Sequence, residues 1–357
     1  MGNDSGCHSQ PMLRGVQASG RYNPRMWFPS ASVRLLSLAS MASVAALCGA
    51  CDDSPSPASS PSAPSSPPPV QAASMPASQP STQPASTSLV ASRVRAARDR
   101  LTASPAGKLV LRSIRHHGGL QAWFAQRAIA FTYDYVPVGD SNKRKTSHQV
   151  VDLLQSRAYH SMSAPAQGTF AFDGNEAWMK LTPPVPFPAR FWSLTPYYFV
   201  GMPFVLSDDG VRLELTEHTG AAVGLPPCDV VAVTFAAGTG DAPDDTYFVY
   251  LDKQSGELLG LRYTVTYAAF FKPGANGRKP DKVVLYSDAR QEGAFRLPRT
   301  HTTYMMRTEH ASSTTAKAAL GQKVTVSTVR DVEHGATFDE ARLLRPAGAV
   351  VDTSLSK

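Results

Sequence analysis

Residues 246–267 read TYFVYLDKQSGELLGLRYTVTY. Two runs within this stretch, 246–252 and 257–267, alternate apolar and polar residues, which is the spacing of a strand with one buried face. Residues 253–256 (KQSG) lie between them and form a short polar segment that ends in glycine, as hairpin turns often do. The stretch therefore predicts two antiparallel strands joined by a tight turn.

The same period of two recurs through most of the C-terminal three quarters of the chain. Comparable runs are 128–136, 169–173, 176–181, 211–217, 229–235, 282–289, 300–307 and 323–332. Short strands that follow one another without intervening helices are typical of an antiparallel meander. We therefore expect an α+β, mainly β domain with one antiparallel sheet of about ten strands.

Two segments depart from this pattern and predict helices. Residues 91–126 read as helical, with a break near Ser104-Pro105 and a stop at the glycines 118–119. Residues 195–210 lack alternation and follow four prolines within 183–188. We expect this second segment to be a helix inserted between strands.

The N-terminal region has the composition of an export signal. Arg34 precedes an apolar run, 35–50, that is shorter than the ~20 residues of a membrane-spanning helix. A positive residue, an apolar run and small residues, in this order, are typical of a secretory signal peptide, which we assign to 1–50. A start at Met26 would give this signal a conventional n-region. The alternatives are an uncleaved anchor helix and a redox-active C-x-x-C pair at 48–51.

The residues around Cys51 resemble the lipobox of bacterial lipoproteins, in which a cysteine after small residues is acylated. Gly49 and Ala50 fit this pattern, whereas Cys48 stands where leucine is usual. The resemblance implies lipidation of Cys51, with palmitate-type acyl chains, and a membrane as partner through this N-terminal anchor.

A tether is predicted directly after the lipidated cysteine. Residues 54–88 contain ten Pro, twelve Ser and six Ala, with no charged and no aromatic residue. Such a composition cannot bury enough apolar surface to fold. We therefore expect 51–90 to be the lipidated cysteine plus a disordered tether, and 91–357 to be a single folded domain.

Motifs for covalent or metal chemistry are missing from the sequence. There is no G-x-S-x-G, H-E-x-x-H, G-x-x-x-x-G-K-[ST] or G-x-G-x-x-G. His116 and His117 are adjacent at a helix end, where a positive charge is favourable, and they cannot face one metal together. Cys228 is predicted to be a small buried residue. The acidic loop 241–245 is predicted to be a turn, with a calcium site as the alternative. The sequence therefore predicts no enzyme, no cofactor and no metal.

The net charge gives no support for a nucleic-acid partner. The formal charge is +7, but four arginines and a single acid lie within residues 1–50. A protein that binds nucleic acid is expected to concentrate its positive charge on the folded domain. We therefore predict no nucleic-acid partner, and the sequence leaves the oligomeric state open.

Several short motifs, taken in order, resemble a known family. They are 114–123 (IRHHGGLQAW), 130–132 (AFT), 172–178 (FDGNEAW), 197–199 (YYF), 202–204 (MPF) and 250–252 (YLD). They are similar to a family of uncharacterised bacterial envelope lipoproteins that looks like part of the LolA/LolB-like superfamily of lipoprotein carriers and receptors. The resemblance covers 106–345. It implies a strongly curved, unclosed antiparallel half-barrel with helices across its concave face, which in the carriers is apolar and receives acyl chains.

The segment 183–206 (PPVPFPARFWSLTPYYFVGMPFVL) is the most informative apolar stretch. A proline-braced aromatic segment across an incomplete barrel favours a lid on an apolar cavity, because ligand sites are lined mainly by such side chains. The residues that we expect to bind the ligand are Trp123, Phe131, Trp178, Phe187, Phe191, Trp192, Tyr197, Phe199, Met202 and Phe204. The alternative is that these residues only fill the concave face as core.

Together these features predict an exported, membrane-anchored envelope lipoprotein with its domain in the periplasm or the extracellular space. Its expected function is the non-covalent binding of a hydrophobic or amphiphilic ligand, such as a lipid or the acyl chain of a lipoprotein. The alternative function is that of a structural or protein-interaction module of the cell envelope, with a filled core and no ligand.

Overall fold

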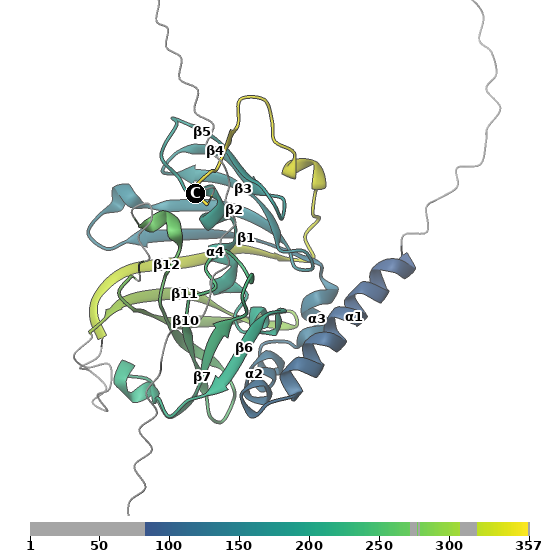
Figure 1. Cartoon of the computed structure of the whole chain (residues 1–357), viewed down its shortest axis with the longest axis vertical. Coiled ribbons are helices and arrows are strands. Elements are labelled where there is room, and N and C mark those ends of the chain that lie inside the picture. Colours follow the sequence, from purple (N-terminus) through teal and green to yellow (C-terminus); the bar gives the residue numbers. More distant parts are fainter. Residues whose placement is uncertain (1–82, 272–276, 278, 308–319, 356–357) are drawn as a thin grey trace, which may run out of the picture. The chain divides into compact units, whose positions relative to one another are not determined.

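One 13-stranded antiparallel sheet forms the framework of the domain (Figure 1). The computed structural model describes residues 83–271, 277, 279–307 and 320–355, with side chains from Ser88 onward, and all of them belong to one compact unit, Pro76–Lys357. Hydrogen-bonded neighbours follow the order β13-β5-β4-β3-β2-β1-β12-β11-β10-β9-β8-β7-β6. Because β13 and β6 lie at opposite ends of this order, the sheet is unclosed. The predicted α+β, mainly β fold is confirmed.

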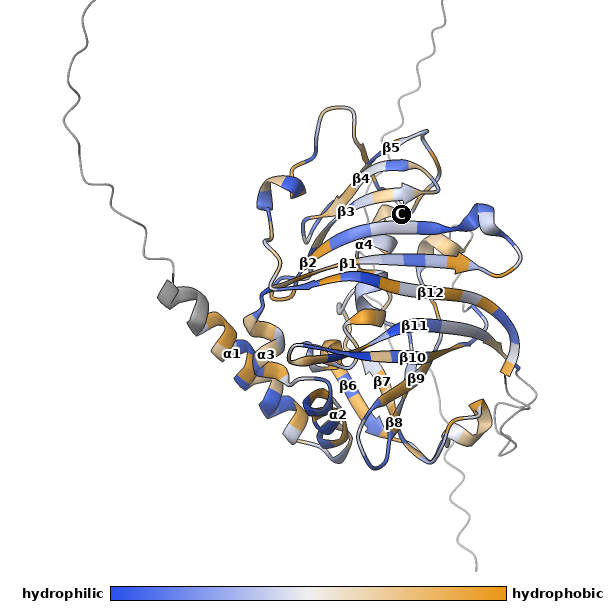
Figure 2. Ribbon diagram, turned by 180° about the vertical axis from the view of Figure 1, so that it is seen from behind, coloured by the Kyte–Doolittle hydropathy of each residue, from blue (hydrophilic) through white to orange (hydrophobic). Residues whose placement is uncertain are grey.

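The strands have the following bounds. They are β1 Ala128–Pro137, β2 Lys145–Asp152, β3 Arg157–Ala164, β4 Gln167–Phe172, β5 Ala177–Thr182, β6 Val211–Leu215, β7 Cys228–Phe235, β8 Tyr247–Asp252, β9 Leu258–Tyr263, β10 Lys282–Glu292, β11 Phe295–Met306, β12 Leu320–His334 and β13 Val350–Val351. Figure 2 shows hydrophilic and hydrophobic residues alternating along β12, the pattern from which such strands are predicted.

Strands β2, β3 and β13 are additional to the ten that the alternation predicts. Strand β2 is buried along most of its length, and its Gln149 is fully buried. Strand β3 likewise buries His160. A strand that places polar residues on a buried face shows no apolar alternation, so the period of two is absent from its sequence.

The hairpin predicted from 246–267 is present as β8 and β9. Asp252 ends β8, and its Oδ1 accepts hydrogen bonds from the backbone N–H groups of Gln254 (3.0 Å) and Ser255 (2.7 Å). Gly256 completes the turn with a φ of +81°, a left-handed conformation that glycine adopts without steric cost. The turn chemistry in the sequence therefore closes this hairpin locally.

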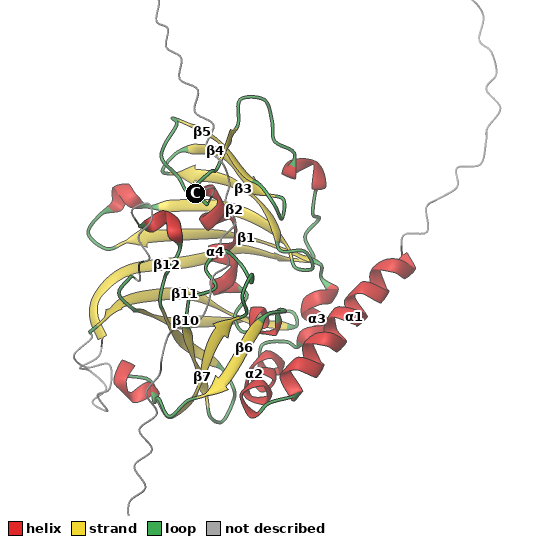
Figure 3. Ribbon diagram, in the orientation of Figure 1, coloured by secondary structure: helices red, strands yellow, loops and turns green. Residues whose placement is uncertain are grey.

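Three helices precede the sheet and lie together beside it (Figure 3). They are α1 Gln83–Thr102, α2 Pro105–His116 and α3 Leu120–Ala125. The predicted break is confirmed, because the Ser104 hydroxyl accepts a hydrogen bond from the Gly107 N–H (3.0 Å) and Pro105 occupies the first turn of α2. None of the helices in these described ranges is both long enough and apolar enough to span a membrane.

Helix α1 begins earlier than the domain boundary predicted at residue 91. Its start at Gln83 lies inside the stretch assigned to the tether. The buried side chains of Val90, Val94 and Leu101 attach this helix to the main core. The predicted signal peptide, Cys51 and the tether up to residue 82 lie outside the described residues.

The inserted helical segment consists of α4 Ala189–Val200 and a 3₁₀ turn, Phe204–Ser207. It starts six residues before the predicted start at 195, directly after the last of the four prolines, Pro188. The helix therefore includes Phe191 and Trp192, and it also contains Pro196 in its interior. Helix α4 packs on β3, β4 and β5 and lies across the concave face of the sheet (Figure 1).

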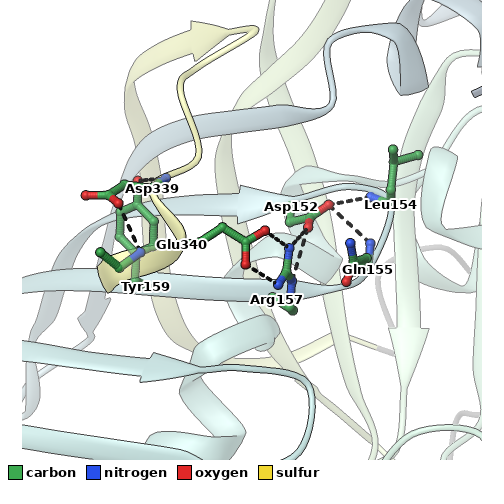
Figure 4. A network of polar contacts seen from close by, with 8 residues as sticks. Asp152, Leu154, Gln155, Arg157, Tyr159, Asp339 and Glu340 are labelled. Atoms are coloured by element: carbon green, nitrogen blue, oxygen red, sulfur yellow. Dashed lines mark hydrogen bonds and ion pairs between the residues drawn. The ribbon is translucent and has the colours of Figure 1, made fainter. Parts of the chain in front are cut away.

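The C-terminal segment that follows β12 covers the part of the opposite face that β1 to β5 form. Ala336 and Leu343 of this segment pack on a separate cluster of buried side chains, which are Ala128, Ala130, Val150, Tyr159, Ala171 and Trp178. Arg157 fastens the segment in place (Figure 4). Its guanidinium pairs with Asp152 at 2.7 Å on the sheet and with Glu340 at 2.7 Å on the segment.

Candidate ligand cavity beneath helix α4

Two cavities lie between helix α4 and the concave face of the sheet. The larger has a volume of ≈ 470 Å³ and the smaller one of ≈ 310 Å³. Both are lined by Phe191, Thr195 and Phe199 of α4 and by Tyr263 and Val265 at and after the end of β9, so the two spaces are adjacent. Both volumes fall in the range of small-molecule sites, ~300–1,000 Å³.

The smaller cavity has an aromatic wall and a polar wall. The aromatic wall comes from α4, where Trp192 lies edge-on to Tyr135 (5.2 Å between ring centroids) and Phe191 lies edge-on to Phe270 (4.7 Å). The facing wall is the sheet, and its lining side chains are Tyr133, Val284, His301, Thr303, Thr325 and Ser327. A ligand in this cavity would therefore contact rings on one side and hydroxyl and imidazole groups on the other.

The polar wall is uncharged at neutral pH. Burial lowers the pKa of His301 to about 3, against the effect of a hydrogen bond to the Pro298 backbone. Burial also raises the pKa of Tyr133, whose hydroxyl lies 3.4 Å from His301 Nδ1. His301 Nε2 is buried and has no hydrogen-bond partner among the described residues. It is available to a ligand or a water molecule in the cavity.

The larger cavity carries charges, and its two arginines are both paired. Arg93 Nη2 lies 2.6 Å from Asp208 Oδ1, and Arg190 Nε lies 3.0 Å from Asp241 Oδ2. Burial raises the pKa of Asp208 to about 6, although the neighbouring Arg93 acts in the opposite direction. Both arginines of this cavity are therefore engaged by carboxylates of the protein.

The acidic loop near the larger cavity is held by protein contacts. Besides the pairing of Asp241 with Arg190, Asp245 accepts hydrogen bonds from the backbone N–H (2.6 Å) and the hydroxyl (2.7 Å) of Thr266. Within the part of the chain that the structure describes, no group of three or more His, Cys, Asp or Glu side chains could hold a metal ion. These contacts hold the loop in place as a turn.

Four of the residues predicted to bind ligand line the cavities. Phe191 and Phe199 line both, Trp192 lines the smaller one and Met202 lines the larger one. Phe191, Trp192 and Phe199 are half-buried, so part of each ring faces open space. Three of the aromatic residues of α4, spread over just more than two helical turns, therefore line the smaller cavity.

The other predicted residues belong to packed clusters. Trp123 stacks on Phe204 with 4.1 Å between ring centroids, and these two residues, Phe131 and Tyr197 lie in the main core. Phe187 packs under α4 in a second cluster. Trp178 lies on the far face of the sheet, where its Nε1 donates to the Leu343 carbonyl (2.7 Å). None of these six residues lines either cavity.

Several lining residues were not among those predicted. Tyr135, Tyr263, Phe270 and the hydroxyl-bearing residues of β11 and β12 come from five separate segments. Strand alternation places each of them on one face of its own strand, except Phe270, which lies in the 3₁₀ turn Ala268–Phe270. Only the register between strands brings them to one cavity.

Comparisons with known proteins give similarities in fold. No protein-family model matches the chain, and no curated protein matches it. Among solved structures, a LolA superfamily protein from Nitrosomonas europaea is 9% identical, with 68% of this chain and 99% of that chain covered and a TM-score of 0.42. An outer membrane lipoprotein-sorting protein domain from Vibrio parahaemolyticus is also 9% identical, with 66% and 94% covered and a TM-score of 0.39.

Proposed function

We propose that the domain binds a hydrophobic or amphiphilic ligand non-covalently in the smaller cavity beneath α4. One observation carries this proposal: three neighbouring aromatic side chains, Phe191, Trp192 and Phe199, line an open space instead of being fully packed. Aromatic residues that face a concave, mostly apolar space are the usual walls of a ligand site. The aromatic rings of this cavity can contact an apolar ligand, and its hydroxyl and imidazole groups can orient that ligand.

Burial of a hydrocarbon chain supplies the driving force in this proposal. Each CH₂ group that leaves water contributes about 0.8 kcal/mol, so ten such groups would contribute roughly 8 kcal/mol. Part of this gain offsets the lost freedom of the ligand on binding. The polar wall with Tyr133 and His301 then determines how a ligand with hydrogen-bonding groups is oriented.

The aromatic wall provides the test of the proposal. The double variant Trp192→Ala/Phe199→Ala should weaken the binding of the hydrophobic fluorophore 1-N-phenylnaphthylamine at least roughly tenfold, because it removes two of the three rings that α4 contributes to the lining. The measurement is a fluorescence titration of the full chain with Cys51→Ser, so that no covalent acyl group competes. The unfolding midpoint in urea is recorded for each protein.

The control is Phe338→Ala, a half-buried aromatic residue on the opposite face of the sheet. It should leave fluorophore binding unchanged. If the double variant loses stability and binds the fluorophore like the parent protein, the α4 aromatics are core residues. The interaction-module alternative would then be the better account.

Export and anchoring through Cys51 are the second part of this proposal and rest on the signal-like run 35–50 and the small residues before the cysteine. We expect Cys51→Ser to move the protein from the membrane fraction to the soluble fraction, or to leave it unprocessed, because a thiol is needed for acylation. Cell fractionation with a mass measurement of the N-terminus checks this. Unchanged fractionation and processing would contradict the lipid anchor.

A further inference from the structure

Two lysines line the smaller cavity, and a third lies against its aromatic wall. Lys279 and Lys282 line it, and Lys145 reaches its aromatic wall, where Nζ lies 5.0 Å from the Trp192 ring centroid and 5.2 Å from that of Tyr135. We call Lys145, Lys279 and Lys282 the lysine rim. They come from β2, from the segment before β10 and from the first residue of β10.

Strand register places the lysine rim at one end of the sheet. Lys145 is paired with Tyr135 near the end of β1, and Lys282 is paired with Met305 near the end of β11. Thr303 of β11 is paired with Thr325 near the start of β12, so both hydroxyls belong to the same end. The opposite end of the concave face is filled by the main core, including Leu297 and Phe295.

The carboxylates nearest to the lysine rim are already bound by arginines. Arg144 binds Asp134 through two hydrogen bonds of 2.7 Å, and Arg262 Nε donates to Asp281 at 2.7 Å. No salt bridge within the described ranges involves a lysine of the rim. Among the residues that the structure describes, the lysines of the rim therefore have no carboxylate partner.

The surroundings of the rim make an unpaired charge costly. All three lysines are half-buried, and Lys279 Nζ lies 4.7 Å from the Phe271 ring centroid. Burial and the neighbouring Lys143 lower the pKa of Lys145, and burial and Lys279 lower the pKa of Lys282. An anion bound beside the Lys279 and Lys282 ammonium groups would offset this cost. The buried hydroxyls of Thr303 and Thr325 could donate to the same anion.

We infer that the ligand of this cavity is an anionic amphiphile, whose hydrocarbon chain lies against the α4 aromatics and whose carboxylate or phosphate group lies at the lysine rim. This inference rests on the proposed function and specifies the class of ligand. An apolar space with one positive end recognises such a molecule by both of its parts. A neutral molecule with the same chain fills the apolar space and leaves the lysines unpaired.

Parinaric acid and its methyl ester test this inference, because they share one fluorescent chain and differ in charge. In the full chain with Cys51→Ser, we expect the acid to bind roughly tenfold more tightly than the ester at pH ~8. Lys279→Gln/Lys282→Gln should remove this difference and leave the affinity for the ester within about twofold. Raising NaCl from about 0.05 M to about 0.5 M should weaken the acid alone, because salt screens the lysines.

The matched control is Lys108→Gln/Lys253→Gln, which removes the same charge from two exposed lysines that line neither cavity. It should keep the preference for the acid. Lys145→Gln is a second rim variant in case the double variant fails to fold, and it should reduce the preference in part. Competition by dodecyl phosphate and by lauric acid against parinaric acid shows which anionic group binds more tightly.

Two results would overturn the inference in different ways. Equal binding of the acid and the ester, unchanged in the rim variants, would leave the proposed function in place and reject the anionic ligand. Binding of neither probe, with a folded protein, would reject the proposed function as well.

Discussion

Acidification from about pH 7 to about pH 4 should lower the free energy of unfolding by several kcal/mol, because three histidines are buried in their neutral form. Burial lowers the pKa of His117 to about 4 and the pKa values of His160 and His301 to about 3. In the unfolded chain each would have a pKa near 6.5. The folded state therefore binds fewer protons, so stability is fully present above about pH 6.5 and is lost as the pH falls. Each histidine adds up to about 1.4 kcal/mol per pH unit to this loss.

His117 shows why the neutral form is required. Its Nδ1 lies 2.5 Å from the Arg296 carbonyl, and its Nε2 lies 3.1 Å from the Leu258 N–H. With a proton on Nδ1 alone, both hydrogen bonds are satisfied. A second proton on Nε2 would face the Leu258 N–H and remove the acceptor. The favourable positive charge expected at this helix end is therefore replaced by a neutral ring that joins α2 to β9 and β11.

Urea unfolding at several pH values checks this prediction. His117→Gln should be less stable than the parent protein at about pH 7, and it should lose about 3 kcal/mol less between about pH 7 and about pH 4. His218→Gln, at an exposed position, is the control and should keep the parent slope. An unchanged slope in His117→Gln would contradict the assignment of a neutral buried imidazole to this position.

Trp123→Ala should destabilise the domain by about 3–5 kcal/mol and leave the affinity of the smaller cavity unchanged. The Trp123 side chain is 0% exposed, stacks on Phe204 and meets Phe295 edge-on at 5.6 Å between ring centroids. Its removal leaves a void in the main core, which the neighbouring elements can fill only in part. The residue lines neither cavity, although the sequence predicted it as a ligand contact.

The test is urea unfolding of Trp123→Ala, with Trp192→Ala as the comparison. Because Trp192 is only half-buried, its removal should cost less stability and more fluorophore affinity. The opposite result, with weak destabilisation and a large loss of binding in Trp123→Ala, would return Trp123 to the ligand site. The two tryptophans thus distinguish core from cavity wall within one domain.

Local features of the sequence were sufficient for much of the fold. Alternation with a period of two predicted ten of the strands, although β1 is buried on both faces from Ala128 to Asp134. The Ser104-Pro105 break between helices and the 253–256 turn followed from capping and turn chemistry within a few residues. These features depend on contacts between residues that are close in the chain, so they can be predicted from the sequence alone.

The candidate site could be predicted only in part. The segment 183–206 was correctly placed across the concave face, and three of its aromatics do line the smaller cavity. The sequence could not show that Trp178 lies away from the cavity. Alternation assigns a residue to one face of a strand, but it does not say which element covers that face. The structure places the C-terminal segment over that side, and Trp178 donates a hydrogen bond to it.

The sequence by itself determined the strand pattern, the helix boundaries near Ser104 and the position of the aromatic segment along the chain. Tertiary structure alone decided which aromatics face open space, and it brought Lys145 to the same end of the cavity as Lys279 and Lys282. The physical reason is that this grouping depends on the register of strands far apart in sequence. The register of a strand pair determines which residues lie opposite each other. It is a property of both strands together, so it cannot be read from one segment of the chain.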